Sequence, residues 1–137
     1  MKAKKAVIFT DGAAEPNPGP AAIGAVIKDE QGRVRAHISQ RIGTTTNNQA
    51  EYRAVIAALE KAIKLGVTHV DLYSDSELVV RQISGRYRVK SPTLKPLYQQ
   101  VKHLQGLLEG LTVTHIPRWQ NTEADKLTNM ALGLSVD

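Results

Sequence analysis

The spacing of apolar residues in the first third of the chain predicts three strands joined by short connections. Residues 6–9 form a nearly continuous apolar run, which is typical of a strand that is covered on both faces. Residues 23–28 predict a second strand. In residues 34–42 apolar and polar side chains alternate, which predicts a third strand with one solvent-exposed face. We expect the first strand to be central in the sheet.

Helical spacing replaces this alternation in the rest of the chain. Apolar residues three or four apart predict a helix that begins at Asn48 and is closed by Gly66 as a C-terminal cap. Ser91 and Pro92 predict the N-cap and first position of a later helix. The other expected elements are strands over residues 67–74 and 111–116 and helices over residues 78–83 and 121–132. This order predicts an α/β fold: a five-stranded mixed sheet, three antiparallel strands and then two parallel ones, flanked by helices.

Composition narrows the class of protein. A chain of 137 residues with 42% hydrophobic side chains is expected to form a single domain over residues 1–137. Its formal net charge of +5 favours a polyanionic partner, nucleic acid before an acidic membrane face. Residues 78–108 contain no Asp or Glu. Such a basic segment either binds a polyanion or forms a solvated basic surface without a partner. Its basic residues are Arg81, Arg86, Arg88, Lys90, Lys95 and Lys102.

The absence of cysteine excludes a disulfide framework and a thiolate metal site. No apolar run is long enough for the core of a signal peptide or for a membrane span. We therefore expect a soluble, cytoplasmic protein that does not associate with membranes, and we expect a monomer.

Four acidic residues are the candidates for chemistry. Asp11 and Asp75 follow predicted strands, and Glu51 and Asp125 lie in the first turns of predicted helices. Each has a structural alternative: Asp11 can close a turn, Asp75 can cap a helix, and the other two match capping boxes. Taken together, two strand ends and two helix starts can point to the same edge of one layered domain.

Such a cluster requires cations. At about 5 Å and an effective dielectric constant of about 20, each pair of ionised carboxylates repels by roughly 3 kcal/mol. Ligation by oxygen alone indicates a hard cation, Mg²⁺ first and Mn²⁺ second. Two such ions activate a water and stabilise the leaving oxygen in phosphodiester hydrolysis. A divalent-metal nuclease is therefore the leading hypothesis.

The sequence blocks around these acids resemble type 1 ribonuclease H, in order and over nearly the whole chain. The blocks are Thr10-Asp11-Gly12 with Asn17-Pro18-Gly19, Thr45-Thr46-Asn47-Asn48-Gln49-Ala50-Glu51, Tyr73-Ser74-Asp75-Ser76, and Asn121-Thr122-Glu123-Ala124-Asp125. The resemblance implies a ribonuclease H-like fold. It also implies an endonuclease that cuts the RNA strand of RNA/DNA hybrids and leaves 5′-phosphate and 3′-hydroxyl ends. Two Mg²⁺ ions would be held by Asp11, Glu51, Asp75 and Asp125.

The same resemblance implies contacts to the hybrid. Thr46 matches a contact to a DNA phosphate, and Ser76 is a candidate RNA contact that also suits a helix start. Arg86 and Lys90 are candidates for backbone contacts, as are Arg41 and Arg88. Residues matched to RNA contacts are Asn17, Asn47, Asn48 and Gln49, with Gly12 beside them, and Asn47 and Asn48 would also cap a helix in any protein.

The chain departs from the bacterial pattern in two places. The connection over residues 117–120 contains no histidine, as in compact, archaeal-like members of the family, and Arg118 is the candidate to replace it; the alternative is an ordinary surface arginine. His115 is expected to be structural. The basic protrusion is reduced to residues 85–90, where Tyr87 either contacts a DNA sugar or covers the core.

Two alternatives to this enzyme remain. One is a module that binds RNA/DNA hybrids or double-stranded RNA without cutting, although a binder has no need of four acids. The other is a different nuclease on the same fold, such as an exonuclease or a junction resolvase.

Overall fold

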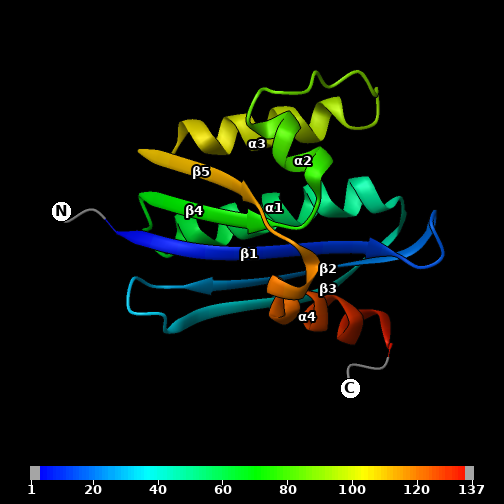
Figure 1. Ribbon diagram of the computed structural model, residues 1–137, viewed down its shortest axis with the longest axis horizontal. Helices are drawn as coiled ribbons and strands as arrows, with labels where there is room; N and C mark the ends of the chain where they lie inside the picture. The colour runs from blue at the N-terminus through cyan, green and yellow to red at the C-terminus, as the bar shows by residue number, and fades with distance from the viewer. Residues whose placement is uncertain (1–3, 135–137) are drawn as a thin grey trace.

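The computed structural model describes residues 4–134 and contains one mixed sheet with helices on both faces (Figure 1). The strand order β3-β2-β1-β4-β5 confirms the predicted five-stranded sheet. The strands are β1 (Lys5–Ala14), β2 (Gly19–Lys28), β3 (Val34–Thr45), β4 (His69–Ser74) and β5 (Gly110–His115). The helices are α1 (Asn47–Lys64), α2 (Glu77–Ile83), α3 (Lys95–Gly106), the 3₁₀ turn η1 (Arg118–Gln120) and α4 (Thr122–Leu132).

Strand β1 is central, as expected, and has a different partner on each side. It pairs in parallel with β4, and this pairing ends at Thr10 opposite Ser74. It pairs in antiparallel fashion with β2 as far as Ala14 opposite Ala21. Asp11 therefore does not follow the end of the strand, because β2 continues to support β1 beyond it. Instead, Asp11 lies where β1 loses its parallel neighbour.

Helix α1 provides most of the core that covers one face of the sheet. Its apolar stripe includes Tyr52, Val55 and Leu59, which are all fully buried. Burying one such side chain stabilises the fold by about 1.5–3 kcal/mol. The helix is closed at Gly66, which has a φ of 82°, as predicted. Its N-cap is Thr46, which accepts a hydrogen bond from the Gln49 amide at 3.2 Å, and not one of the asparagines.

Helix α4 covers the opposite face, where it crosses β2 at Gly24 (Figure 1). A Cβ atom at Gly24 would lie 2.4 Å from the carbonyl oxygen of Ala124, so only glycine allows this approach. The polar side of β3, predicted to face solvent, also contacts α4. Ser39 donates to the Leu127 carbonyl at 2.6 Å, and Arg41 Nε donates to the Ala131 carbonyl at 2.8 Å. Arg41 thus binds the last carbonyls of α4.

Helix α3 begins later than predicted. Its N-cap is Leu94, and residues 92–94 form a turn in which the Ser91 carbonyl accepts from the amides of Leu94 and Lys95. The proline at the start of the helix is Pro96 and not Pro92. None of the helices within residues 4–134 is long and apolar enough to cross a membrane.

Candidate metal centre

Three of the four acidic residues meet where the parallel half of the sheet ends. Asp11 comes from β1, Glu51 from α1, and Asp75 from the residue after β4. One carboxylate oxygen of each lies within 4.8 Å of the others. Asp11 and Glu51 are each only 7% exposed. The fold therefore concentrates negative charge in a largely buried place.

Glu51 is held by backbone and side chain together. Because α1 begins at Asn47, Glu51 lies in the second turn and forms no capping box. One of its carboxylate oxygens accepts a hydrogen bond from the Gly12 amide, and the other accepts from Ser74 Oγ at 3.4 Å. A Cβ atom at Gly12 would lie 2.4 Å from the backbone of Ala50. Gly12 therefore allows the close approach of β1 and α1 that positions Glu51.

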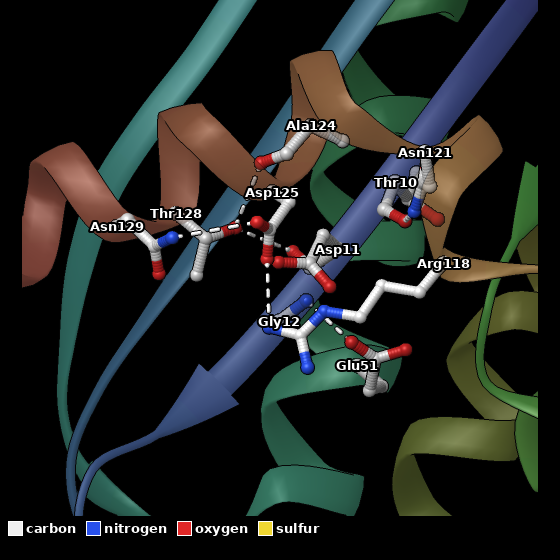
Figure 2. Close-up of polar contacts among 10 residues, drawn as sticks. All are labelled: Thr10, Asp11, Gly12, Glu51, Arg118, Asn121, Ala124, Asp125, Thr128 and Asn129. Atoms are coloured by element: carbon white, nitrogen blue, oxygen red, sulfur yellow. Dashed lines mark hydrogen bonds and ion pairs between the residues drawn. The ribbon is translucent and has the colours of Figure 1, made fainter. Parts of the chain in front are cut away.

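Asp125 lies beside this group of three but has partners of its own (Figure 2). Its Oδ1 is 3.2 Å from Arg118 Nη2, and its Oδ2 accepts from Asn129 Nδ2 at 3.4 Å. No hydrogen bond of a capping box involves its carboxylate within the described chain. Asp125 and the other three acids line one hollow of about 350 Å³. Figure 2 shows the Arg118 guanidinium between the carboxylates of Asp11 and Asp125 on one side and that of Glu51 on the other.

Several supporting residues were not identified from the sequence. Asn121 is 1% exposed and donates through Nδ2 to the Thr10 carbonyl at 2.8 Å. Thr128 donates to the Asp11 carbonyl at 3.4 Å. Asn121, Asp125 and Thr128 are spaced by four and three residues, so they share one face of α4. A polar stripe at helical spacing around Asp125 was the signal that could have identified them.

Burial shapes the electrostatics of the cluster. It raises the pKa of Asp11 to about 6; the charges of Asp75 and Asp125 add to this shift, and a hydrogen bond from Thr128 opposes it. Burial, with the charges of Asp11 and Asp75, raises the pKa of Glu51 well above its usual range. Burial also raises the pKa of Asp75, against the effects of Asn121 and Arg118. Without a cation, these carboxyl groups favour their neutral form more than exposed ones do.

The donor set fits a hard divalent cation. It consists of carboxylate oxygens close enough to share one ion, because oxygen ligands lie about 2.0–2.6 Å from Mg²⁺ or Ca²⁺. Asp11, Glu51 and Asp75 would hold this ion. Asp125 would bind a second ion through Oδ1 only if the ion pair between Oδ1 and Arg118 opened.

The residues implied as substrate contacts fall into two groups. Gly12, Asn47, Asn48 and Ser76 line the same hollow as the acids. Asn47 Oδ1 accepts from the backbone amide of Ala14 at 2.7 Å, and the backbone amide of Asn47 donates to Asn17 Oδ1 at 3.0 Å. The residues outside the hollow are the exposed Asn17, Thr46, which caps α1, Gln49, which lines a separate groove beside α1, and Arg86 and Lys90, which are exposed between α2 and α3.

The structure also places three other residues that the sequence singled out. His115 is the last residue of β5, where it lies opposite Ser74 in the parallel pairing with β4, and its side chain is exposed. Tyr87 is 43% exposed and lies 5.5 Å from the Arg81 guanidinium, so it does not cover the core. Ser76 is the N-cap of α2 and accepts from the Val79 amide at 3.4 Å, whereas Asp75 caps nothing.

Comparisons with known proteins agree with this architecture. The family model described as reverse transcriptase-like matches residues 9–131. A bifunctional protein of Mycobacterium tuberculosis is 46% identical over 129 residues, which are 93% of this chain and 35% of that protein. Ribonuclease HI of Halobacterium salinarum is 41% identical over 124 residues, 90% of this chain and 62% of that protein. The chain thus spans about a third of the length of the Mycobacterium tuberculosis protein and less than two thirds of the length of the Halobacterium salinarum protein.

Solved structures show the same similarity. The crystal structure of the Halobacterium salinarum enzyme superposes with a TM-score of 0.92 at 40% identity and covers 94% of this chain and 98% of that one. LC11-RNase H1, isolated from compost and solved in complex with an RNA/DNA hybrid, gives 0.89 at 45% identity, covering 93% and 96%. The chain therefore belongs to the reverse transcriptase-like family and, within it, to type 1 ribonuclease H.

Proposed function

We propose that this chain is an endonuclease that hydrolyses the RNA strand of RNA/DNA hybrids and leaves 5′-phosphate and 3′-hydroxyl ends. The observation that carries the proposal is the buried group of Asp11, Glu51 and Asp75, whose oxygens lie within 4.8 Å of one another. Bringing ionised carboxylates this close together costs free energy, and a bound cation offsets that cost. A similar protein, LC11-RNase H1, has been solved with an RNA/DNA hybrid, which supports the choice of substrate.

The cofactor of this proposal is a pair of Mg²⁺ ions, with Mn²⁺ as a substitute, held by the three buried acids and Asp125. When bound, divalent ions of this kind activate water and stabilise charge on the leaving oxygen. The chain itself supplies the orientation. The Gly12 amide and Ser74 fix Glu51, and Asn129 fixes Asp125.

Substrate binding is assigned to the residues around the hollow. Asn47, Asn48, Gly12 and Ser76 face the RNA strand, and Asn17 supports Asn47 through the hydrogen bond to its amide. Gln49 extends this contact along α1. Thr46 binds a DNA phosphate, and the exposed Arg86 and Lys90 bind the backbone outside the hollow.

Arg118 is assigned the role of the missing loop histidine. Its guanidinium lies 3.2 Å from Asp125 and between the aspartates and Glu51 (Figure 2), where negative charge increases during attack on phosphorus. A fixed positive charge at this point stabilises that charge and helps the product to leave. The protein is further proposed to act as a cytoplasmic monomer with one domain.

The test uses three labelled duplexes of the same sequence: an RNA/DNA hybrid, DNA and RNA. Internal cuts confined to the RNA of the hybrid, with Mg²⁺ and not with EDTA, are expected. The matched variant is Asp11→Asn, which is expected to lose cleavage and keep hybrid binding. Retention of the hybrid or of RNA duplex by wild type without cutting would favour the binding module. Cleavage of the DNA duplex would favour another nuclease.

A further inference from the structure

The one tryptophan of the chain directly follows Arg118, which lines the acidic hollow, and its side chain is largely exposed. Trp119 is 73% exposed, the largest exposed fraction among the large hydrophobic side chains within residues 4–134. It belongs to η1 and directly follows Arg118. Most tryptophan side chains are largely buried and stabilise the fold in this way, whereas the indole of Trp119 is in contact with solvent. This exposure suggests that the indole contacts a ligand.

The turn that carries Trp119 is tied to the edge of the sheet that presents the acids. On one side of the turn, the Ile116 amide donates to the Ser74 carbonyl at 3.0 Å, next to Asp75. On the other, Asn121 donates to the Thr10 carbonyl at 2.8 Å, next to Asp11. Ile116 and Asn121 are 8% and 1% exposed, whereas residues 117–120 between them are all exposed.

Two backbone hydrogen bonds also close the turn. The Gln120 amide donates to the Pro117 carbonyl, and the Asn121 amide donates to the Arg118 carbonyl, both at 2.9 Å. Trp119 lies two positions before Asn121, so at most roughly 7 Å of chain lies between their Cα atoms. Trp119 thus belongs to a hydrogen-bonded turn between Arg118, which lines the hollow, and Asn121, which is bonded to β1.

We propose that Trp119 is a substrate-binding residue that packs its indole against a sugar of the RNA/DNA hybrid bound at the acidic hollow. This inference rests on the proposed function. A sugar is the expected contact, because the bases of a duplex are stacked inward and the sugars present apolar faces beside the phosphates. The neighbouring Arg118 supplies charge to the same backbone, and Trp119 supplies contact area without charge.

The test uses the emission of Trp119, which is unmixed because the chain has one tryptophan. Wild-type protein in EDTA is titrated with unlabelled hybrid while its emission is recorded. In parallel, the anisotropy of labelled hybrid is measured against protein concentration. We expect the emission to change and to saturate with the same dissociation constant that anisotropy gives.

Variants separate Trp119 from the charged contacts. Trp119→Ala is expected to bind hybrid about 5- to 20-fold more weakly, the scale of an aromatic contact to one nucleotide, and Trp119→Phe to recover part of the loss. Because the indole carries no charge, the slope of log K against log salt should stay that of wild type. Arg86→Ala is the matched control, with a slope reduced by about 1. Trp119→Ala should unfold at the wild-type temperature, because the side chain is exposed.

Each other outcome overturns a defined statement. Hybrid binding without a change in emission, or wild-type affinity in Trp119→Ala, would overturn the role of Trp119 and leave the nuclease proposal intact. A Trp119 emission that changes with protein concentration and not with added hybrid would overturn the substrate-binding role. It would indicate instead that Trp119 contacts a second copy of the chain. Failure of the labelled hybrid to bind wild type in EDTA and Asp11→Asn in Mg²⁺ would overturn both proposals.

Discussion

At the scale of single residues, the ionisation of Asp11 links the candidate site to the stability of the fold. Burial raises its pKa to about 6, from an ordinary value of 3.8. The folded protein therefore binds this proton more tightly than the unfolded chain does. Between about pH 4 and pH 6, the free energy of unfolding of the metal-free protein should fall as pH rises, and the loss should be complete above this range. The contribution of Asp11 is about 3 kcal/mol.

Asp11→Asn tests this relation because it removes the titrating group and keeps the shape. The variant should be more stable than wild type at pH 7.5 in EDTA and close to it at pH 4.5, as measured by urea unfolding. Glu60→Gln, which changes an exposed carboxylate of α1, is the control and should leave the pH dependence of wild type. An Asp11→Asn curve parallel to that of wild type would contradict the assigned burial cost.

Arg118 gives a second prediction at this scale. The role proposed for it beside Asp125 predicts that Arg118→Ala slows turnover more than it weakens binding. A decrease in kcat of about 10- to 100-fold is expected, the scale of one electrostatic contact to the reacting group, with a smaller change in KM. Steady-state kinetics on the hybrid provide both numbers. Unchanged kinetics would exclude Arg118 from the site, and Arg118→Lys should retain part of the rate because it keeps the charge.

The residue scale also shows what the sequence could predict. The four acids stood out because each follows a predicted strand or lies in the first turn of a predicted helix, which is local information. Their supports are not local: Asn121 contacts Thr10 and Thr128 contacts Asp11 across more than 100 residues of chain. Such pairs exist only after α4 packs on the sheet. Asp125 differs from the other acids in that it forms an ion pair with Arg118. This pair also depends on the folded structure, because the turn η1 places Arg118 beside Asp125.

At the scale of elements, apolar periodicity was sufficient for the order and type of strands and helices but not for their ends. Strand β1 continues past Asp11 because β2 supplies partners that no local pattern reveals. Helix α3 begins after Ser91, because residues 92–94 form a turn before it. Capping by Thr46 in place of an asparagine leaves the side chain of Asn47 free to accept from the Ala14 amide. A tertiary contact therefore decided the end of β1, whereas a local turn decided the start of α3 and a local hydrogen bond decided the N-cap of α1.

The crossing of α4 over β2 provides a prediction at this scale. Gly24→Ala places a methyl group 2.4 Å from Ala124 O and 2.6 Å from Thr128 Oγ1, so α4 must shift. A loss of about 2 to 3 kcal/mol in the free energy of unfolding is expected. The matched control is Gly106→Ala at the end of α3, where a Cβ atom meets nothing within 4 Å and no loss is expected. Equal stability of both variants in urea unfolding would show that α4 does not pack tightly.

At the scale of the whole molecule, positive and negative charge are separated. The chain carries a net charge of +5, yet its most buried charges are the acidic residues at one edge of the sheet. Within the described residues, Arg81 pairs with Glu77, whereas no ion pair joins Arg86, Arg88 or Lys90 to an acid. Exposed cations without partners suit a polyanionic ligand, and buried acids suit small cations. The two requirements are met by a nucleic acid bound together with metal ions.

This separation predicts how Mg²⁺ affects folding. An ion that binds the folded state alone stabilises it by RT ln(1 + [L]/Kd), which is about 2.7 kcal/mol at a hundredfold excess over Kd. For a chain of this size, such a gain raises the unfolding temperature by roughly 5–15 °C. Mg²⁺ should therefore raise Tm at pH 7.5, where the carboxyls can ionise, and raise it less at pH 5, where protons compete at Asp11.

The measurement is thermal unfolding with increasing MgCl₂, against KCl at matched ionic strength. Screening alone would act equally in both salts, so the difference between them isolates specific binding. Asp11→Asn removes one ligand and the main source of repulsion, so its Tm in EDTA should be higher than that of wild type and its response to Mg²⁺ smaller. A wild-type Tm that responds to MgCl₂ and KCl alike would mean that the oxygens of Asp11, Glu51 and Asp75 do not form a cation site in the folded protein.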